Sequence, residues 1–261
     1  AVTLCAVAVK MHGGGLMSAG FQCKQFFVAH DQCAMKVGTD ALILGAWASL
    51  PATGPILDIG AGSGILSLML AQRSLGLQAI TAIELDSAAA QQATANVQRS
   101  PWPATVRVIK GDILTYQTAE RYALIVSNPP FFQASLPSPD AARQQARHND
   151  SLPFAALLHK AADLLAEGGE FSLILPPDSA TVFCQLALNS GLQLQRSTSV
   201  YAQPGKPLRR LLLSFRRAMA QPDGATVANY TLPDDELMIQ QDRGSYSEQY
   251  RQLLKDFYLK F

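Results

Sequence analysis

The sequence predicts an α/β fold in which a seven-stranded, mostly parallel sheet ends in an antiparallel hairpin. Short apolar runs alternate with helical segments between residues 56 and 175, a pattern typical of a parallel sheet with helices on both faces. The last two apolar runs, 192–201 and 208–215, are joined only by Ala-Gln-Pro-Gly-Lys-Pro. No crossover helix fits into that connection, so we expect these two strands to pair antiparallel.

The individual elements follow in order from local signals. The aromatic-rich segment 21–28 is expected to form a strand or a capping segment. Thr39 or Asp40 is expected to cap a helix that Pro51 closes. The expected strands of the sheet are 56–59, 79–83, 105–109, 122–126, 170–175, 192–201 and 208–215. The expected helices are 42–50, 65–73, 87–99 with Ser87 as its N-cap, 152–165, and 247–259 docked through Leu253, Leu254, Phe257 and Tyr258.

Length and composition bound the domain organisation. The chain has 261 residues, of which 48% are hydrophobic, so it can bury a substantial core in one domain with a small appendage. We expect a disordered leader or start-site artefact over 1–20 and a capping segment over 21–50. The main α/β domain is expected over 51–218, and a tail with a docking helix over 219–261.

Composition also excludes several classes of protein. Cys5, Cys23, Cys33 and Cys184 form no CxxC pair, which argues against a zinc site or a disulfide framework and predicts a cytoplasmic protein with reduced thiols. No apolar run is long enough to span a bilayer. We therefore expect no metal, no membrane anchor and no obligate protein partner. The 21 basic and 20 acidic residues give a net charge of +1, so locally clustered cations must hold any nucleic acid.

A glycine-rich turn follows the first strand of the alternation. Gly60, Gly62 and Gly64 allow a ligand to approach the backbone closely. Glu84 ends the second strand, where an acid can accept hydrogen bonds from both hydroxyls of a ribose. Asp112 ends the third strand, near the expected position of an adenine ring. The turn and the two acids together predict a nucleotide site.

Asp58 narrows the choice of nucleotide. It completes the pattern D-x-G-x-G-x-G, whereas dinucleotide enzymes favour G-x-G-x-x-G with a helix N-terminus aimed at a pyrophosphate. A carboxylate at this point repels a pyrophosphate but can hold the ammonium of a methionine moiety, directly or through water. The sequence therefore predicts S-adenosylmethionine as cofactor. The alternative is that the glycines serve packing and the acids are merely solvated.

The motif Ser-Asn-Pro-Pro-Phe at 127–131 follows the fourth strand and is the most specific feature of the chain. Adenine N6 is a poor nucleophile because its lone pair is delocalised into the ring. The side-chain oxygen of Asn128 and the backbone oxygen of Pro129 can accept its two N–H protons, which favours a pyramidal nitrogen directed at the methyl group. Pro129 and Pro130 stiffen the loop, and Phe131 can stack on a splayed-out base. In isolation, the motif would be an ordinary proline turn beside a core phenylalanine.

A sheet of this kind with a terminal hairpin is the architecture of the Rossmann-like class I methyltransferases. The glycine turn followed by NPPF resembles the amino-methyltransferases that modify adenine, guanine or glutamine amide nitrogens. More narrowly, the chain resembles the bacterial tRNA1(Val) (adenine-37-N6)-methyltransferase family, which implies a tRNA substrate. This likeness covers nearly everything after the leader. Its segments are 24–40, 44–47, 100–102, 145–147, 246–250 and 257–259.

The resemblance also implies cofactor contacts from residues 36–40, namely Lys36, Gly38 and Thr39, which pattern alone does not reveal. One departure concerns Phe131, since the family usually has NPPY where this chain has NPPF. The missing hydroxyl leaves stacking intact but removes any hydrogen bond that it would make.

Basic residues near the predicted site are candidates for RNA contacts. Arg147 follows the NPPF loop, which we expect to fold over the substrate, and Arg209 and Arg210 flank the terminal hairpin. An ordinary solvated surface is the alternative for each of them. For His30 and His148 we expect structural roles. Further basic candidates are Arg143, Lys206, Arg216, Arg217, Arg243 and Lys255.

Several rival functions share these features. The nearest are methylation of guanine N2 in rRNA, of adenine in DNA, or of a glutamine in a release factor. Release-factor enzymes carry a sizeable N-terminal helical domain and restriction-type DNA enzymes a large recognition insert, and the sequence has no pattern for either. A non-catalytic RNA- or nucleotide-binding module would not need the intact Asn128-Pro-Pro. The glycine spacing and the hairpin disfavour a nicotinamide oxidoreductase.

Overall fold

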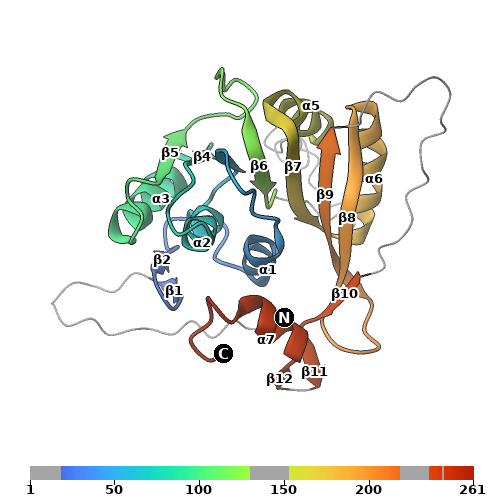
Figure 1. Ribbon diagram of the computed structural model, residues 1–261. Helices are drawn as coiled ribbons and strands as arrows, with labels where there is room; N and C mark the ends of the chain where they lie inside the picture. Colours follow the sequence, from blue (N-terminus) through green and yellow to red (C-terminus); the bar gives the residue numbers. More distant parts are fainter. Residues whose placement is uncertain (1–18, 130–152, 218–234, 243) are drawn as a thin grey trace, which may run out of the picture.

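The computed structural model describes residues 19–129, 153–217, 235–242 and 244–261 (Figure 1). Its main feature is an eight-stranded sheet with the order β10-β8-β9-β7-β6-β3-β4-β5. The sheet strands are β3 (Ile56–Ile59), β4 (Ile80–Glu84), β5 (Val106–Lys110), β6 (Tyr122–Ser127), β7 (Leu165–Leu175), β8 (Leu192–Tyr201), β9 (Leu208–Arg217) and β10 (Asp235–Met238). Two small hairpins lie outside it, β1 (Gly20–Gln22) with β2 (Phe27–Ala29) and β11 (Gln240–Asp242) with β12 (Ser245–Tyr246).

The predicted fold class is confirmed, with one strand more than expected. Strands β3 to β7 pair in parallel, while β9 pairs antiparallel with both β7 and β8. The expected hairpin is therefore present. The eighth strand, β10, comes from the tail and adds to β8 in parallel. This strand could not be recognised from the sequence, because its stretch is polar and only Leu237 of it is buried.

Helices cover both faces of the sheet. The described helices are α1 (Thr39–Trp47), α2 (Ile65–Arg73), α3 (Ser87–Arg99), α5 (Phe154–Leu164), α6 (Pro177–Asn189) and α7 (Glu248–Leu254). One core cluster joins buried side chains of α1, α2 and α7 with the two termini of the described chain. The other joins α5 and α6 to the opposite face. None of the described helices is both long and apolar enough to cross a membrane.

Helix α6 was not predicted. Pro176 and Pro177 follow the expected strand 170–175, and proline is favoured at the first helical position, where its missing N–H costs nothing. Pro177 occupies that position, and the helix buries Ala180, Phe183 and Cys184 on one face.

Two helix caps and one helix end differ from the prediction. Gly38, with no side-chain hydrogen bond, precedes α1, so neither Thr39 nor Asp40 caps it. Asp86, not Ser87, caps α3, because its carboxylate accepts from the backbone N–H of Ala89 at 2.8 Å. Ser247 caps α7, which is shorter than predicted and ends at Leu254. The predicted docking residues still pack: Leu254, Phe257 and Tyr258 are buried, and Leu253 packs against the same core.

Candidate active site

The carboxyl ends of β4, β3 and β6 lie level at one edge of the sheet. Ile59 of β3 is in register with Ile83 of β4 on one side and with Ser127 of β6 on the other. The N–H of Gly60 donates to the carbonyl of Ile83 at 2.9 Å, and the Ser127 hydroxyl donates to the carbonyl of Ile59 at 2.9 Å. The glycine turn, Glu84 and Asn128 therefore follow three neighbouring strand ends, where ligands bind in open parallel sheets.

The glycine turn borders open space. Gly60, Gly62 and Gly64 have φ angles of +72°, +55° and +82°, a region that residues with a side chain rarely adopt. A Cβ placed on Gly60 or Gly62 would meet no atom of the described chain within 4 Å, whereas on Gly64 it would lie 3.4 Å from the Cβ of Ala93 in α3. Gly64 thus permits close helix packing, and Gly60 and Gly62 leave room for a ligand.

Glu84 is held in place with acceptor capacity to spare. Its Oε2 accepts from the N–H of Gly62 at 2.7 Å and its Oε1 from the N–H of Asp86 at 2.8 Å. Each carboxylate oxygen has two acceptor positions, so each retains one. A carboxylate fixed in this way beside the glycine turn can accept from the two hydroxyls of a ribose.

Asp58 is fully buried and only half satisfied. Its Oδ2 accepts from the backbone N–H of Ser67 at 3.1 Å and from the Ser67 hydroxyl at 2.7 Å. Its Oδ1 has no hydrogen-bond partner in the described chain. Burial raises the pKa of Asp58 to about 7, against the opposing effect of the two Ser67 hydrogen bonds and with a further increase from the charge of Glu84. A buried carboxylate with a free oxygen is suited to an ammonium group.

This environment predicts pH-dependent cofactor binding. An ammonium beside Asp58 favours the ionised carboxylate and lowers its pKa, so binding below pH 7 must release a proton. We expect the affinity for S-adenosylhomocysteine to fall with decreasing pH below about 7, a range in which the ligand's own amino group stays charged. Calorimetry at about pH 6 in buffers of different ionisation enthalpy measures the released proton. Asp58→Asn should show neither effect, and equal proton release by both proteins would contradict this role.

Asn128 presents an unpaired acceptor at the end of β6. Its Oδ1 is buried and has no hydrogen-bond partner among the described residues. Buried acceptors without partners are rare, and this one directly follows the anchored Ser127. Pro129 is buried beside it. The predicted site residues Pro130, Phe131 and Arg147 lie outside the described residues, as do Arg143, Arg243 and His148.

Asp112 follows β5 and closes a local turn. Its Oδ1 accepts from the N–H of Leu114 at 2.9 Å. The N–H of the preceding Gly111 donates to the carbonyl of Glu84 at 2.9 Å, so the two acids lie at adjoining strand ends. A contact from Asp112 to an adenine ring remains a prediction.

The segment 36–40 joins the N-terminal hairpin to α1. The N–H of Val37 donates to Nδ1 of the buried His30 at 3.2 Å, which gives that histidine the expected structural role. Burial and the charge of Lys36 lower the pKa of His30, which keeps the ring neutral and able to accept. Lys36 is exposed, and Gly38 and Thr39 lie at the start of α1.

The predicted hairpin arginines differ in their surroundings. Nε of Arg210 forms an ion pair with Asp40 at 2.7 Å, so this guanidinium contacts the start of α1. Arg209 is partly exposed on the same strand. Among the further candidates, Arg216 pairs with Glu170. If Arg210 contacts RNA, its guanidinium must bind the phosphate and Asp40 at the same time.

Sequence reasoning missed two amides of α3. Gln92 and Asn96 are buried and bind the segment 29–33. They stand four residues apart, on the same face as the buried Ala89 and Ala93. Two amides spaced four residues apart on the alanine face of the helix could have indicated buried, hydrogen-bonded side chains.

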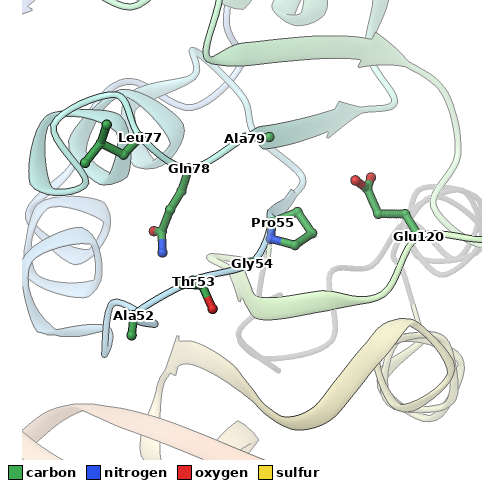
Figure 2. A pocket seen from close by; sticks show the side chains of 8 residues that line it. All are labelled: Ala52, Thr53, Gly54, Pro55, Leu77, Gln78, Ala79 and Glu120. Carbon is green, nitrogen blue, oxygen red and sulfur yellow. The ribbon is translucent and has the colours of Figure 1, made fainter.

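A hollow of about 430 Å³ lies at the opposite edge of the sheet (Figure 2). Residues 52–55 precede β3, residues 77–79 precede β4 and Glu120 precedes β6, so the hollow faces the amino ends of these strands. Ligands of such sheets bind at the carboxyl ends. We therefore assign this hollow no part in cofactor binding. The lining residues are Ala52, Thr53, Gly54, Pro55, Leu77, Gln78, Ala79 and Glu120.

The described ranges contain no group of three or more His, Cys, Asp or Glu side chains that could hold a metal ion. Cys23, Cys33 and Cys184 are buried, free thiols. Burial raises the pKa of each, to about 12, 11 and 12 respectively, so these thiols are poor nucleophiles.

Comparisons with known proteins show which family the chain resembles. A family model described as "Methyltransferase small domain" matches residues 34–179. A tRNA1(Val) (adenine(37)-N6)-methyltransferase from Bacteroides thetaiotaomicron is 46% identical over 239 residues, which cover 92% of this chain and 97% of that protein. A protein of the same name from Yersinia pestis is 44% identical over 94% of this chain and 96% of its own length. The structure of a predicted O-methyltransferase from Agrobacterium tumefaciens covers 84% of this chain and 96% of its own, with a TM-score of 0.62 and 19% identity, and supports the fold alone.

Proposed function

The chain belongs to the tRNA1(Val) (adenine(37)-N6)-methyltransferase family, and from this premise we propose that it methylates N6 of adenine 37 in tRNA1(Val). S-adenosylmethionine is the methyl donor. The observation that carries the proposal is the buried, unpaired Oδ1 of Asn128 at a strand end next to the glycine turn. We place the protein in the cytoplasm, where its substrate lies.

The residues present fit this donor. The open space over Gly60 and Gly62 leaves room for the cofactor, and Glu84 can accept hydrogen bonds from its ribose hydroxyls. Oδ1 of Asp58, which has no partner in the described chain, can accept a hydrogen bond from its ammonium group. When bound, the donor supplies an electrophilic methyl group on a sulfonium, which leaves as a neutral thioether. The remaining proposed cofactor contacts are those of Lys36, Gly38, Thr39, Asp112 and, as a minor one beside its catalytic role, Asn128.

Asn128 and Pro129 prepare the acceptor nitrogen. The Asn128 side-chain oxygen and the Pro129 carbonyl accept the two N–H protons of the adenine amine, which concentrates the nitrogen lone pair for attack. As the N–C bond forms, the nitrogen becomes positively charged and both acceptors are more strongly bound than in the ground state. The nitrogen then loses one proton to solvent, so no general base is required before transfer.

Recognition of the RNA is assigned to the aromatic and basic residues predicted from the sequence. Phe131 is proposed to stack on the extruded base, in the manner of aromatic side chains at flipped nucleotides. Arg147 and Arg209 are proposed to contact phosphates, with Arg210 bridging from its ion pair with Asp40.

The identity of the modified nucleoside tests the proposal. Incubation with labelled S-adenosylmethionine and bulk tRNA lacking N6-methyladenine, followed by digestion to nucleosides, should place the label in N6-methyladenosine. A transcript of tRNA1(Val) with guanine in place of adenine 37 should remain unlabelled. Label in guanosine or in protein would instead support one of the rival amino-methyltransferase functions.

A further inference from the structure

Asn96 joins the N-terminal segment to the cofactor turn. Its Nδ2 donates to the carbonyl of Ala29 at 2.8 Å and to the carbonyl of Ser63 at 2.9 Å, and its Oδ1 accepts from the N–H of Ala29 at 3.0 Å. Ala29 ends β2, whereas Ser63 lies between Gly62 and Gly64 of the turn. Asn96 is 1% exposed. One buried side chain thus fixes the distance between two segments remote in sequence.

Gln92 extends the same connection one helical turn earlier. Its Oε1 accepts from the N–H of Gln32 at 3.0 Å and from the thiol of Cys33 at 3.2 Å. Its Nε2 donates to the carboxylate of Asp31 at 2.7 Å. Together the two amides bind four of the five residues from 29 to 33, so α3 determines the path of this stretch.

The stretch held by α3 leads directly to residues 36–40, which carry proposed cofactor contacts. His30 accepts from the N–H of Val37, which closes the loop between the two residues. Gly38 and Thr39 then begin α1. The position of residues 36–40 relative to the glycine turn therefore depends on contacts that pass through Asn96, Gln92 and His30.

We propose that Asn96 and Gln92 are positioning residues for the cofactor: they hold residues 29–40, hereafter the strap, in register with the glycine turn. The inference rests on the proposed function, since it concerns the same cofactor site. Neither amide touches the cofactor or the adenine. Their effect appears in cofactor affinity and leaves the methyl-transfer step, which depends on Asn128, nearly unchanged.

Replacement of the amides tests the proposal. For Asn96→Ala we expect the Kd for S-adenosylhomocysteine and the KM for S-adenosylmethionine to rise about tenfold, which corresponds to about 1.4 kcal/mol. The kcat at saturating cofactor should stay within about twofold of the wild-type value. Asn96→Asp keeps the size and the acceptor but replaces the amide donor, so it should show the same loss. Gln92→Ala, which leaves the turn contact intact, should raise the Kd about threefold.

Matched controls separate positioning from folding. Gln91→Ala and Gln98→Ala change exposed side chains of the same helix and should leave the Kd unchanged. A lower melting temperature with an unchanged Kd in Asn96→Ala and Gln92→Ala would show a structural role only and would overturn the inference. If Asn96→Ala does not fold, Gln92→Ala is the test: a threefold rise in its Kd supports the inference, and an unchanged Kd overturns it. Failure of the wild-type protein to bind S-adenosylhomocysteine would overturn the proposed function itself, and the inference with it.

Discussion

Replacement of Asn128 by alanine is expected to lower kcat for methyl transfer to tRNA by about 10²- to 10³-fold, the loss seen when one oriented hydrogen-bonding group is removed from a transition state. Oδ1 of Asn128 is a buried acceptor with no partner in the described chain. No hydrogen bond within the described chain therefore has to be broken before it accepts an N–H of the adenine. Without it, the nitrogen lone pair stays delocalised. The Kd for S-adenosylhomocysteine should change little, because the glycine turn and Glu84 carry that affinity.

Single-turnover kinetics with saturating cofactor and tRNA measure this loss directly. Asn128→Asp keeps an oxygen acceptor and should retain more activity than the alanine variant. Asn189→Ala, an exposed asparagine at the end of α6, is the matched control and should behave as wild type. If the alanine variant transfers methyl groups at the wild-type rate, Asn128 is not an acceptor for the substrate amine.

Replacement of Glu84 by alanine is expected to raise the Kd for S-adenosylmethionine about 10²-fold, equivalent to about 3 kcal/mol for two charge-assisted hydrogen bonds to ribose hydroxyls. The substitution also removes the acceptor that holds the N–H of Gly62 at 2.7 Å, so the turn loses its support. We expect the kcat at saturating cofactor to change far less than the KM.

Calorimetry with S-adenosylhomocysteine measures the change in affinity. Glu120→Ala is the matched control, because it removes an acid from the hollow at the amino ends of the strands (Figure 2) and should leave the Kd unchanged. The melting temperature of each variant shows whether the fold is retained. An equal loss of affinity in both variants would contradict the assignment of the cofactor to the carboxyl edge.

The sequence was sufficient to predict that the candidate site residues lie together at the carboxyl ends of the strands. The glycine turn, Glu84, Asp112 and Asn128 each come directly after or at the end of an apolar run, and parallel strands bring such ends to one edge. The register of β3 with β4 and β6 then follows from burial on both faces. Local pattern was sufficient because every residue involved is close in sequence to its strand.

Features that depend on long-range packing were not predictable in this way. The hydrogen bonds of Asn96 to Ala29 and Ser63 join residues 67 and 33 positions away. Asp58 was expected to hold an ammonium, but its burial and the occupation of one oxygen by Ser67 depend on how α2 packs over β3. Helix α6 was not predicted because prolines both end strands and begin helices, and the pair Pro176-Pro177 does not by itself distinguish the two.

A crystal structure with S-adenosylhomocysteine and an anticodon stem-loop of tRNA1(Val) would test the central claim most directly. The account predicts adenine 37 extruded into the carboxyl edge of the sheet, with its N6 within about 3.2 Å of both Asn128 Oδ1 and the Pro129 carbonyl. The ribose of the cofactor should lie on Glu84 and its sulfur toward that N6. An Asn128 amide directed away from the adenine, or a cofactor bound elsewhere than over Gly60 and Gly62, would contradict it.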